Sequence, residues 1–374
     1  MSRYTDTQIM EIASHFRFEP VPVSCKELRS GNVNVTYRLD VDPADKSKSY
    51  ILQRINTVAF KDPDSLMENI RLVTRYIKDA YIAKGQDPAR RVLDFIDAAE
   101  GDTENGTLLY RDAEDSCWRA YRYVDDVTAY DRIESADLFR EAGRGFGEFQ
   151  TMLSAFPAEQ LTETIVGFHN TPARYEVFLA KVAEDPAGRV ASLSDEIAFF
   201  KSREGLMRGI VDRLADGTLP LRVTHNDTKL NNVLLDNATG KALCVIDLDT
   251  VRPGSSLYDY GDAVRYGACT AAEDEPDTSK IGFDMELFRA FTEGFVSTTA
   301  GSLTDTEIRL LPLGIAVITC ELAMRFLTDY IDGDKYFKIN CPDHNLVRAR
   351  AQMKLLCEVE KAMPAMNAFV EGML

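Results

Sequence analysis

The sequence lacks the cysteine pairs and the long apolar runs that mark secreted and membrane-spanning proteins. Its 374 residues include seven cysteines, and no two of them stand close enough for a Cys-x-x-Cys metal or redox pair. The segment from Met1 to Asp6 has no signal-peptide core, and the longest apolar stretch, Leu310 to Cys320, contains Pro312 and is too short to cross a bilayer. We therefore expect reduced thiols, a cytoplasmic location and no membrane insertion.

Positive charge is also scarce. Lys and Arg number 43 against 60 Asp and Glu, which gives a net charge of −17 at pH 7. Nucleic acid and anionic membranes would repel such a chain, so we expect neither as a partner. If the substrate is a phosphate anion, a metal cation or local hydrogen-bond donors must attract it, because the overall field of the chain does not.

Two familiar phosphate-binding glycine motifs are missing. Gly240-Lys241 is followed by Ala242 and has no glycine five residues before it, which excludes a Walker-type P-loop. The run from Gly143 to Gly147 has the spacing of a dinucleotide turn, but it lies inside a helical pattern with no strand before it. These glycines therefore predict close helix packing.

What the sequence does contain is a change of periodicity along its length. Short β-branched or aromatic runs occupy the first third, at 21–29, 35–41, 49–55, 91–97, 107–111 and 118–124, with one helix near 63–79. Helical spacing then dominates, at 136–154, 172–183, 195–214, 284–297, 305–331 and 345–370. We predict an α+β fold of two lobes: a small sheet lobe with one main helix, 1–124, and a larger, mostly helical lobe, 125–374.

One strand pair interrupts the helical part. Apolar runs on both sides of the turn sequence 237–240 predict an antiparallel hairpin. If Leu235 faces Cys244, Asn232 comes to lie opposite Asp247. A carboxamide and a carboxylate together with water and phosphate oxygens suit Mg²⁺, which resists full dehydration.

The polar residues around this hairpin have the spacing found in kinases. Asp227 and Asn232 are separated by four residues, and Asp247 follows at the end of the next strand. Each residue alone is more simply explained as a turn residue. The joint pattern, with His225 two residues before Asp227, favours a catalytic loop that orients a hydroxyl group and holds a metal ion.

On these residues, on Ile246–Asp249 and on Tyr258–Tyr260, the chain resembles the aminoglycoside phosphotransferase and choline kinase superfamily, which shares the protein-kinase architecture. Longer stretches resemble the bacterial N-acetylhexosamine 1-kinases in particular, from near residue 12 to near residue 357. These stretches are Ser14–Phe16, Tyr50–Gln53, Leu161–Ile165, Thr224–Leu235, Arg265–Ala268 and Met324–Leu327.

The resemblance implies roles for the loop residues. Asp227 would be the general base that accepts the proton of the sugar's anomeric hydroxyl during in-line transfer of the γ-phosphoryl group of ATP. Asn232 and Asp247 would hold Mg²⁺, with Asp249 as a second metal ligand or a supporting group. Lys229 would neutralise the transferring phosphoryl group. His225 and Asp259 are expected to support the loop by hydrogen bonding.

The sheet lobe would bind the nucleotide. By resemblance, the backbone N–H groups of Gly31, Asn32 and Val33 would cover its phosphates. Gln53 stands on the third strand where most kinases carry a lysine, so it can donate hydrogen bonds but brings no charge. Glu68, on the helix that follows, thereby loses the usual partner of that position, and we interpret this as a subfamily trait.

Adenine would pair with backbone groups of the connector at Tyr123, Val124 and Asp125, for which an ordinary aromatic strand end is an equally good reading. The sugar site is implied by resemblance alone: Arg325 and Tyr336 would hydrogen-bond the sugar, while Tyr266 and Asn32 would line its pocket.

Without the resemblance, the four-residue spacing of Glu321, Arg325 and Asp329 predicts a solvated stripe of ion pairs on a helix. The resemblance instead places the guanidinium of Arg325 at the sugar, where it suits vicinal hydroxyls and an N-acetyl carbonyl.

We therefore predict a monomeric, ATP- and Mg²⁺-dependent kinase that phosphorylates the 1-position of N-acetylglucosamine or N-acetylgalactosamine. The alternatives are a kinase of the same superfamily for choline, homoserine or an aminoglycoside, and a nucleotide-binding pseudokinase, which the missing lysine suggests. Cationic substrates call for acidic or aromatic cages, and Arg325 would repel them. A protein kinase is disfavoured because Thr250 to Leu257 leaves no room for an activation loop.

Overall fold

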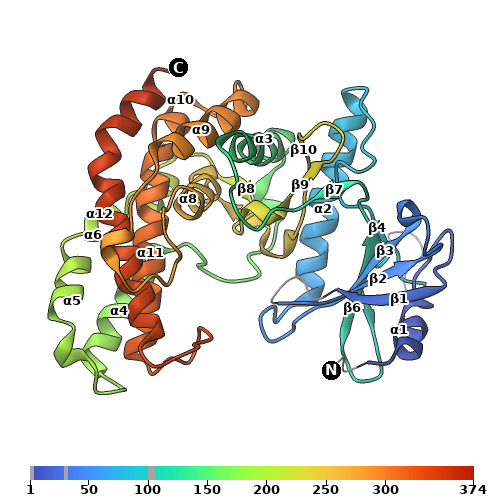
Figure 1. Cartoon of the computed structure of the whole chain (residues 1–374), viewed down its shortest axis with the longest axis horizontal. Helices are drawn as coiled ribbons and strands as arrows, with labels where there is room; N and C mark the ends of the chain where they lie inside the picture. The colour runs from blue at the N-terminus through green and yellow to red at the C-terminus, as the bar shows by residue number, and fades with distance from the viewer. Residues whose placement is uncertain (1–3, 29–32, 100–105) are drawn as a thin grey trace. The chain divides into compact units, whose positions relative to one another are not determined.

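The computed structural model describes residues 4–28, 33–99 and 106–374 (Figure 1). The chain forms two compact units. The first unit comprises 1–129, 160–165 and 234–252, and the second comprises 130–159, 166–233 and 253–374. The small-lobe and large-lobe boundary near residue 125 stays a prediction, while the mixed α+β class with a sheet at the N-terminal end and helices beyond it is confirmed.

The first unit is built on an antiparallel sheet in the order β1-β2-β3-β6-β4, with β5 pairing on β6. Its strands are β1 (Ser24–Leu28), β2 (Val35–Asp40), β3 (Tyr50–Arg54), β4 (Phe95–Ile96), β5 (Tyr110–Arg111) and β6 (Cys117–Arg122). Each lies within one of the runs predicted from sequence or one residue outside it. Tyr50, Leu52 and Trp118 are buried together with Ile9 in the core of this sheet.

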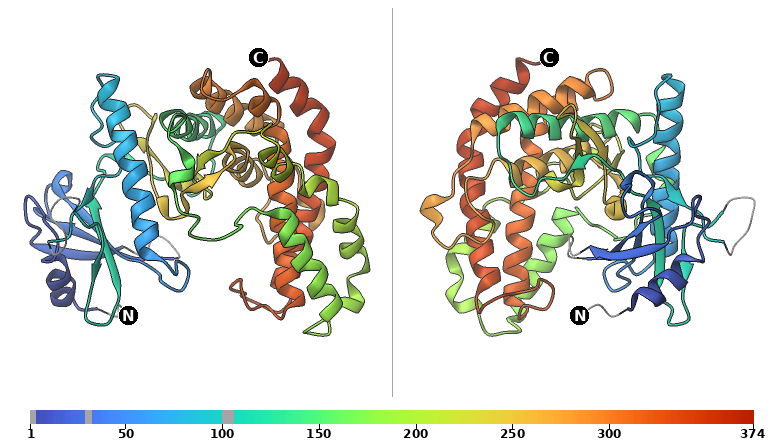
Figure 2. Two further views of the ribbon diagram at one scale, coloured as in Figure 1. Left: turned by 180° about the vertical axis from the view of Figure 1, so that it is seen from behind. Right: turned by 45° about the vertical axis from the view of Figure 1, so that its right-hand side comes forward.

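Two helices belong to the same unit. The first, α1 (Asp6–Ala13), was not predicted; it begins at a capping box between Thr5 and Gln8. The predicted helix is α2 (Pro63–Ala83), which begins at the N-cap Asp62 with proline in its first turn. It runs beside the sheet (Figures 1 and 2). Met67 of this helix contacts Arg119 of β6.

The predicted hairpin is confirmed as β9 (Val233–Asp236) and β10 (Ala242–Val245), and β7 (Val127–Thr128) pairs with the other edge of β9. The turn is tighter than predicted. Asp236 donates its N–H to the carbonyl of Lys241 (2.9 Å) and accepts the N–H of Gly240 (2.7 Å), whose φ is +68°. This bulged turn pairs Asp236 with Gly240 and Lys241, so the register is shifted by two residues from the predicted facing of Leu235 and Cys244.

The second unit is mostly helical. Its longer helices are α3 (Ala136–Met152), α4 (Thr171–Glu184), α8 (Ser256–Gly267), α9 (Met285–Thr299), α11 (Leu311–Ile331) and α12 (His344–Glu371). The predicted helix 195–214 is instead three short ones, α5 (Ser194–Lys201), α6 (Glu204–Met207) and α7 (Val211–Ala215), and the predicted helix 305–331 is broken at Leu310 into α10 (Asp305–Arg309) and α11. A short sheet joins β8 (Arg222–Thr224) to β11 (Arg252–Gly254).

Glycine packing in this unit follows the prediction. A Cβ on Gly143 would lie 2.3 Å from the carbonyl oxygen of Phe291, and one on Gly294 would lie 2.0 Å from that of Arg140. Both distances are shorter than a van der Waals contact, so α3 and α9 approach as closely as they do because these positions carry no side chain.

Helix α11 lies against α4, α8 and α12, and its neighbour α12 runs beside it in Figure 2. By length and composition alone α11 is apolar enough to cross a membrane, but 78% of that window is buried inside the protein. It is therefore a core helix of the second unit.

Candidate active site

One buried carboxylate holds the loop before β9, residues 225–232, by hydrogen bonds. Asp259, on α8, is 2% exposed and accepts the backbone N–H groups of His225 (2.8 Å) and Asn226 (2.7 Å) and the side-chain amide of Gln150 (2.8 Å). Its own carbonyl accepts the hydroxyl of Thr228 (2.6 Å). Burial raises the pKa of Asp259, although the charge of His225 and the two N–H donors act to lower it.

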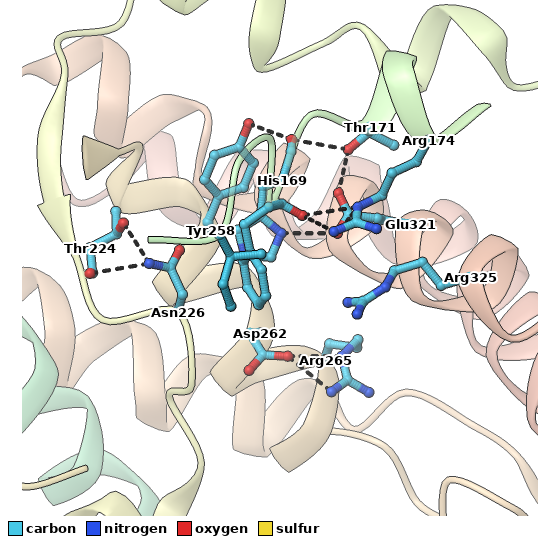
Figure 3. A network of polar contacts seen from close by, with 12 residues as sticks. His169, Thr171, Arg174, Thr224, Asn226, Tyr258, Asp262, Arg265, Glu321 and Arg325 are labelled. Carbon is cyan, nitrogen blue, oxygen red and sulfur yellow. Dashed lines mark hydrogen bonds and ion pairs between the residues drawn. The ribbon is translucent and has the colours of Figure 1, made fainter. Parts of the chain in front are cut away.

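The backbone of the loop turns sharply at Asn226, whose φ is +63°. The amide of Asn226 donates to the carbonyl (3.2 Å) and hydroxyl (2.9 Å) of Thr224, which stabilises this left-handed conformation (Figure 3). His225 is fully buried and makes edge contacts with Phe146 and Phe149. Its Nδ1 accepts the N–H of Asp227 (3.2 Å), so His225 supports the loop.

Two predicted catalytic residues, Asp227 and Lys229, and one predicted metal ligand, Asn232, meet at the end of this loop. The side chain of Asp227 is 26% exposed, and its Oδ1 lies 2.8 Å from Nζ of Lys229. Nδ2 of Asn232 donates to the carbonyl (2.8 Å) and to Oδ2 (3.2 Å) of Asp227. Because the amide nitrogen of Asn232 is directed at Asp227, its oxygen is the group left to accept from, or ligate, something else.

The other two predicted metal ligands belong to the first unit and differ from each other. Asp247 follows β10 with φ +61° and is exposed. Asp249 is 4% exposed, forms an ion pair with Arg119 and accepts a hydrogen bond from Asn34 (2.7 Å). No cluster of three or more His, Cys, Asp or Glu side chains in the described ranges is placed to hold a metal ion.

The predicted nucleotide residues are placed as follows. Gly31 and Asn32 lie outside the described residues, and Val33 is 49% exposed just before β2. Gln53 donates to Thr36 (3.1 Å) and accepts from Arg119.

In the connector, the N–H of Tyr123 donates to the carbonyl of Ser49 (3.0 Å), and the carbonyl of Asp125 accepts from Arg90 (2.7 Å). Two of the backbone groups predicted to pair with adenine are thus engaged, while Val124 lies between them.

Arg325 is surrounded by aromatic rings of the second unit. Its guanidinium carbon lies 5.7 Å from the ring centroid of Phe168, 5.8 Å from Tyr336 and 5.5 Å from Phe337. Nη2 reaches the hydroxyl of Tyr336 at 3.5 Å. Among the described residues, no carboxylate lies within ion-pair distance of Arg325. The site therefore brings Arg325 and Tyr336 together, and Tyr266, on α8, is 44% exposed.

One turn of α11 before Arg325, Glu321 is buried among polar partners (Figure 3). Its carboxylate accepts the hydroxyl of Thr171 (2.7 Å) and lies 3.0 Å from Nδ1 of His169 and 3.6 Å from Arg174. Burial alone would raise the pKa of Glu321, but the positive charges of His169, Arg174 and Arg325 outweigh it and lower the pKa to about 2.

The predicted solvated stripe is therefore wrong at both of its acidic positions. Asp329 is 5% exposed and accepts the backbone N–H groups of Lys335 (2.9 Å), Tyr336 (2.8 Å) and Phe337 (2.9 Å) and the amide of Asn345 (2.9 Å). Asp329 thus fixes the turn that carries Tyr336 beside Arg325.

The sequence prediction missed His169 and Arg174 in this group. Burial lowers the pKa of the Arg174 guanidinium, and the charge of Arg325 lowers it further. His169 stacks on Tyr258 with ring centroids 4.6 Å apart. The only signal was their closeness to the stretch Leu161–Ile165, which resembled the sugar kinases but was given no role.

Residues 24–284 match the family model described as the phosphotransferase enzyme family. Among solved structures, a microcompartment-associated aminopropanol kinase is 15% identical with a TM-score of 0.60, over 96% of this chain and 98% of that one. Choline kinase from Cryptosporidium parvum Iowa II is 14% identical with a TM-score of 0.56, over 99% and 98% of the two chains.

A spectinomycin phosphotransferase, solved in complex with ADP and spectinomycin, is 13% identical with a TM-score of 0.53, over 95% of this chain and all of that one. At these identities the likeness shows a shared fold, which is the protein-kinase-like fold with an antiparallel N-terminal sheet and a helical C-terminal part.

Proposed function

Since the chain belongs to the phosphotransferase enzyme family, whose model matches residues 24–284, we propose that this small-molecule phosphotransferase transfers the γ-phosphoryl group of ATP to the anomeric hydroxyl of N-acetylglucosamine or N-acetylgalactosamine. The proposal includes a monomeric enzyme in the cytoplasm. The single observation that carries the chemistry is the arrangement of Asp227, Lys229 and Asn232 on a loop fastened by Asp259.

Asp227 is the proposed base because its carboxylate is both held and accessible. Asn232 and Lys229 each occupy one of its oxygens, which fixes the plane of the carboxylate, and a quarter of the side chain remains exposed. An acceptor hydroxyl that donates to Asp227 is oriented for in-line attack and loses its proton as the bond to phosphorus forms. Lys229 is half exposed, and in this proposal it moves from Asp227 to the oxygens of the transferring group.

Asn232 and Asp247 are the proposed ligands of a divalent cation. The side-chain oxygen of Asn232 and the exposed carboxylate of Asp247 are hard oxygen ligands, few in number, as Mg²⁺ prefers when phosphates and water complete its shell. When bound, Mg²⁺ would neutralise charge on the β- and γ-phosphates. In the connector, Val124 is the residue whose backbone groups would pair with adenine, while Val33 would help to cover the phosphates.

For the acceptor, Arg325 is the proposed recognition residue, with Tyr336 beside it. A guanidinium among aromatic rings, with no carboxylate partner in the described part of the chain, offers several fixed N–H donors to hydroxyl and N-acetyl oxygens. Tyr266, on α8, would line the same pocket. A neutral polyol suits these donors.

The structural neighbours named above act on aminopropanol, choline and spectinomycin, according to their names, and an amino alcohol is the alternative acceptor for this chain. The cation of such a substrate calls for acidic or aromatic groups. Arg174 and Arg325 together place two positive charges in this part of the second unit, of which Glu321 neutralises one. The net positive charge that remains would repel a cationic amine and favours an uncharged sugar as the acceptor.

The test is an ADP-release assay with N-acetylglucosamine, N-acetylgalactosamine, choline, aminopropanol, homoserine and an aminoglycoside as acceptors. We expect turnover with the two hexosamines, its loss in Asp227→Asn, and a raised KM for the hexosamine in Arg325→Met. The matched control is Arg208→Met, which removes an exposed arginine paired only along its own segment with Asp212. Turnover of a cationic amine alone, or ADP release that Asp227→Asn leaves unchanged, would exclude the proposal.

A further inference from the structure

A ladder of polar side chains crosses three strands inside the first unit. Thr36 of β2 is paired with Gln53 of β3, and Gln53 is paired with Arg119 of β6. Gln53 donates to the hydroxyl of Thr36 (3.1 Å), and its oxygen accepts both Nε (3.0 Å) and Nη2 (2.9 Å) of Arg119. The strand that lacks a lysine is therefore adjacent to a cation on the neighbouring strand.

Arg119 is buried and its charge is neutralised by one residue. Its side chain is 3% exposed, and it lies beside Met67 and the ring of Phe95. Nη1 forms an ion pair with Asp249, which follows Asp247 by two residues. A buried guanidinium needs such a partner, because burial of an unpaired charge is strongly unfavourable.

Both oxygens of Asp249 are occupied. One accepts from Arg119, and the other accepts from Nδ2 of Asn34 (2.7 Å). The side-chain oxygen of Asn34 accepts the N–H of Asn56 (3.0 Å), just beyond β3. Asp249 thus connects β6, the segment leading into β2 and the segment after β3, and each of its oxygens already accepts a hydrogen bond from one of these partners.

The residue that usually pairs with the third-strand lysine is engaged elsewhere. Glu68 forms a bidentate ion pair with Arg71 on its own helix. The side chain of Glu68 is 49% exposed and that of Arg71 is 28% exposed. The buried residue that α2 directs at this region is Asn69, which donates to the carbonyls of Thr162 (2.7 Å) and Val251 (3.1 Å). The segment containing Asp247 and Asp249 is therefore held from the sheet by Arg119 and from α2 by Asn69.

We propose that Arg119 is a positioning residue which, through Asp249, fixes the turn that presents Asp247, and that Asp249 is an anchor of this turn, not a metal ligand. The cation that is missing at position 53 of β3 is thereby replaced on β6 by one that acts on the protein and does not contact the nucleotide. The proposal rests on the proposed function only in taking Asp247 as a ligand of the nucleotide-bound metal.

The two roles of Asp249 predict opposite effects of removing Arg119. If Asp249 anchors the turn, Arg119→Met loosens the position of Asp247. The affinity for ADP in the presence of Mg²⁺ should then fall by about 10- to 100-fold, as is usual for residues that orient a metal ligand. If Asp249 is itself a ligand, the same substitution frees its carboxylate and strengthens that binding. Arg119→Lys keeps the charge but loses the paired contacts to Gln53, so we expect an intermediate effect.

The experiment is calorimetric titration of ADP into the whole chain at a series of Mg²⁺ concentrations, for the wild type, Arg119→Met, Arg119→Lys and Asn34→Ala. Asn34→Ala removes one hydrogen bond to Asp249 and leaves the Arg119–Asp249 ion pair in place. It therefore tests the anchor even if a thermal melt shows that Arg119→Met is not folded. Arg71→Met is the matched control, since it removes an arginine–carboxylate pair within α2, and we expect it to bind like the wild type.

Weaker Mg²⁺-dependent ADP binding in Arg119→Met and Asn34→Ala supports the proposal. Tighter or unchanged binding in Asn34→Ala, or in a folded Arg119→Met, overturns it. Because the readout is ADP binding, it is independent of the acceptor: failure of the hexosamine assignment would appear as absent sugar turnover in a wild type that still binds Mg²⁺ and ADP.

Discussion

Asp259 in the second unit and Asp249 in the first are both buried carboxylates, and each supports a more exposed aspartate. Asp259 fastens the loop of Asp227 by accepting two backbone N–H groups and one side-chain amide. Asp249 fastens the turn of Asp247 by accepting only side chains, those of Arg119 and Asn34. The first anchor depends mainly on backbone N–H groups, with one side chain, Gln150, beside them, and the second depends on two particular side chains.

The same division recurs within the second unit. Asp329 accepts three successive backbone N–H groups in the turn that carries Tyr336, as Asp259 does in its loop. Glu321, in contrast, is held by His169, Thr171 and Arg174, as Asp249 is held by an arginine and an amide. Backbone-anchored carboxylates fix the shape of a segment, whereas cation-anchored ones also balance charge and so respond to pH and to loss of a partner.

The largest effect should come from substitution of Asp227 or Asp247, the two aspartates whose segments Asp259 and Asp249 hold in place. Asp227→Asn removes the proposed base and should lower kcat by about 10²- to 10⁴-fold, the usual contribution of general base catalysis, while ADP binding is retained. Asp247→Asn should instead weaken Mg²⁺-dependent ADP binding. Steady-state kinetics and calorimetry on both variants separate the two roles. Asp216→Asn, at an exposed carboxylate that accepts the N–H of Thr218, is the control, and equal losses of ADP binding in the two variants would contradict the division.

Asp259→Asn should be the next most damaging change. The amide nitrogen of Asn would face N–H donors that now meet a carboxylate, so we expect a loss of about 3 kcal/mol in the free energy of unfolding together with a fall in kcat. Urea unfolding followed by circular dichroism measures the first. Asp284→Asn, which alters the half-buried N-cap of α9, should cost less, and an Asp259 variant as stable as the wild type would show that Asp259 does not anchor the loop.

The pH dependence of stability tests whether Glu321 is held by positively charged partners. Its pKa lies at about 2 in the folded chain, below the ordinary 4.5, so it contributes stability that is present above pH 4.5 and is lost as the pH falls toward 2. The shift corresponds to a contribution on the order of 3 kcal/mol. Glu321→Gln should therefore be less stable at pH 7, and the gap to the wild type should close between pH 4.5 and 2. A gap that stays constant across this window would contradict the assignment.

The smallest effect should come from Asp329→Asn, which leaves one oxygen to accept from the turn of Tyr336. We expect the KM for the sugar to rise several-fold, with kcat and the KM for ATP close to wild type. Hydrogen exchange at the amides of Lys335, Tyr336 and Phe337 should quicken in the same variant. Unchanged exchange together with an altered KM would assign Asp329 a direct role at the sugar.

The sequence predicted those features that follow from local patterns. The strands of the first sheet, α2, α3 and the hairpin β9–β10 follow from periodicity, caps and turn residues, and the spacing of Asp227 and Asn232 is a local motif on one loop. The close packing of Gly143 was predictable because a glycine inside a helical pattern implies a near neighbour.

Features that join distant residues were not predicted. Arg119 and Asp249 are 130 positions apart, and His169 and Glu321 are 152 apart. Nothing in the local pattern of β6 indicates that its arginine is buried, because burial is decided by which strands and helices become neighbours. For the same reason Glu321 and Asp329 resembled solvated helix residues in the sequence and are buried in the structure.

The most direct test of the central claim is to identify the atom that receives the phosphoryl group. The purified chain would be incubated with ATP, Mg²⁺ and N-acetylglucosamine, and the product examined by proton and phosphorus NMR. We expect the phosphorus to couple to the anomeric proton of the sugar, and we expect no such product with Asp227→Asn. A phosphate on any other hydroxyl, or phosphorylation of choline or aminopropanol with the hexosamine left intact, would contradict it.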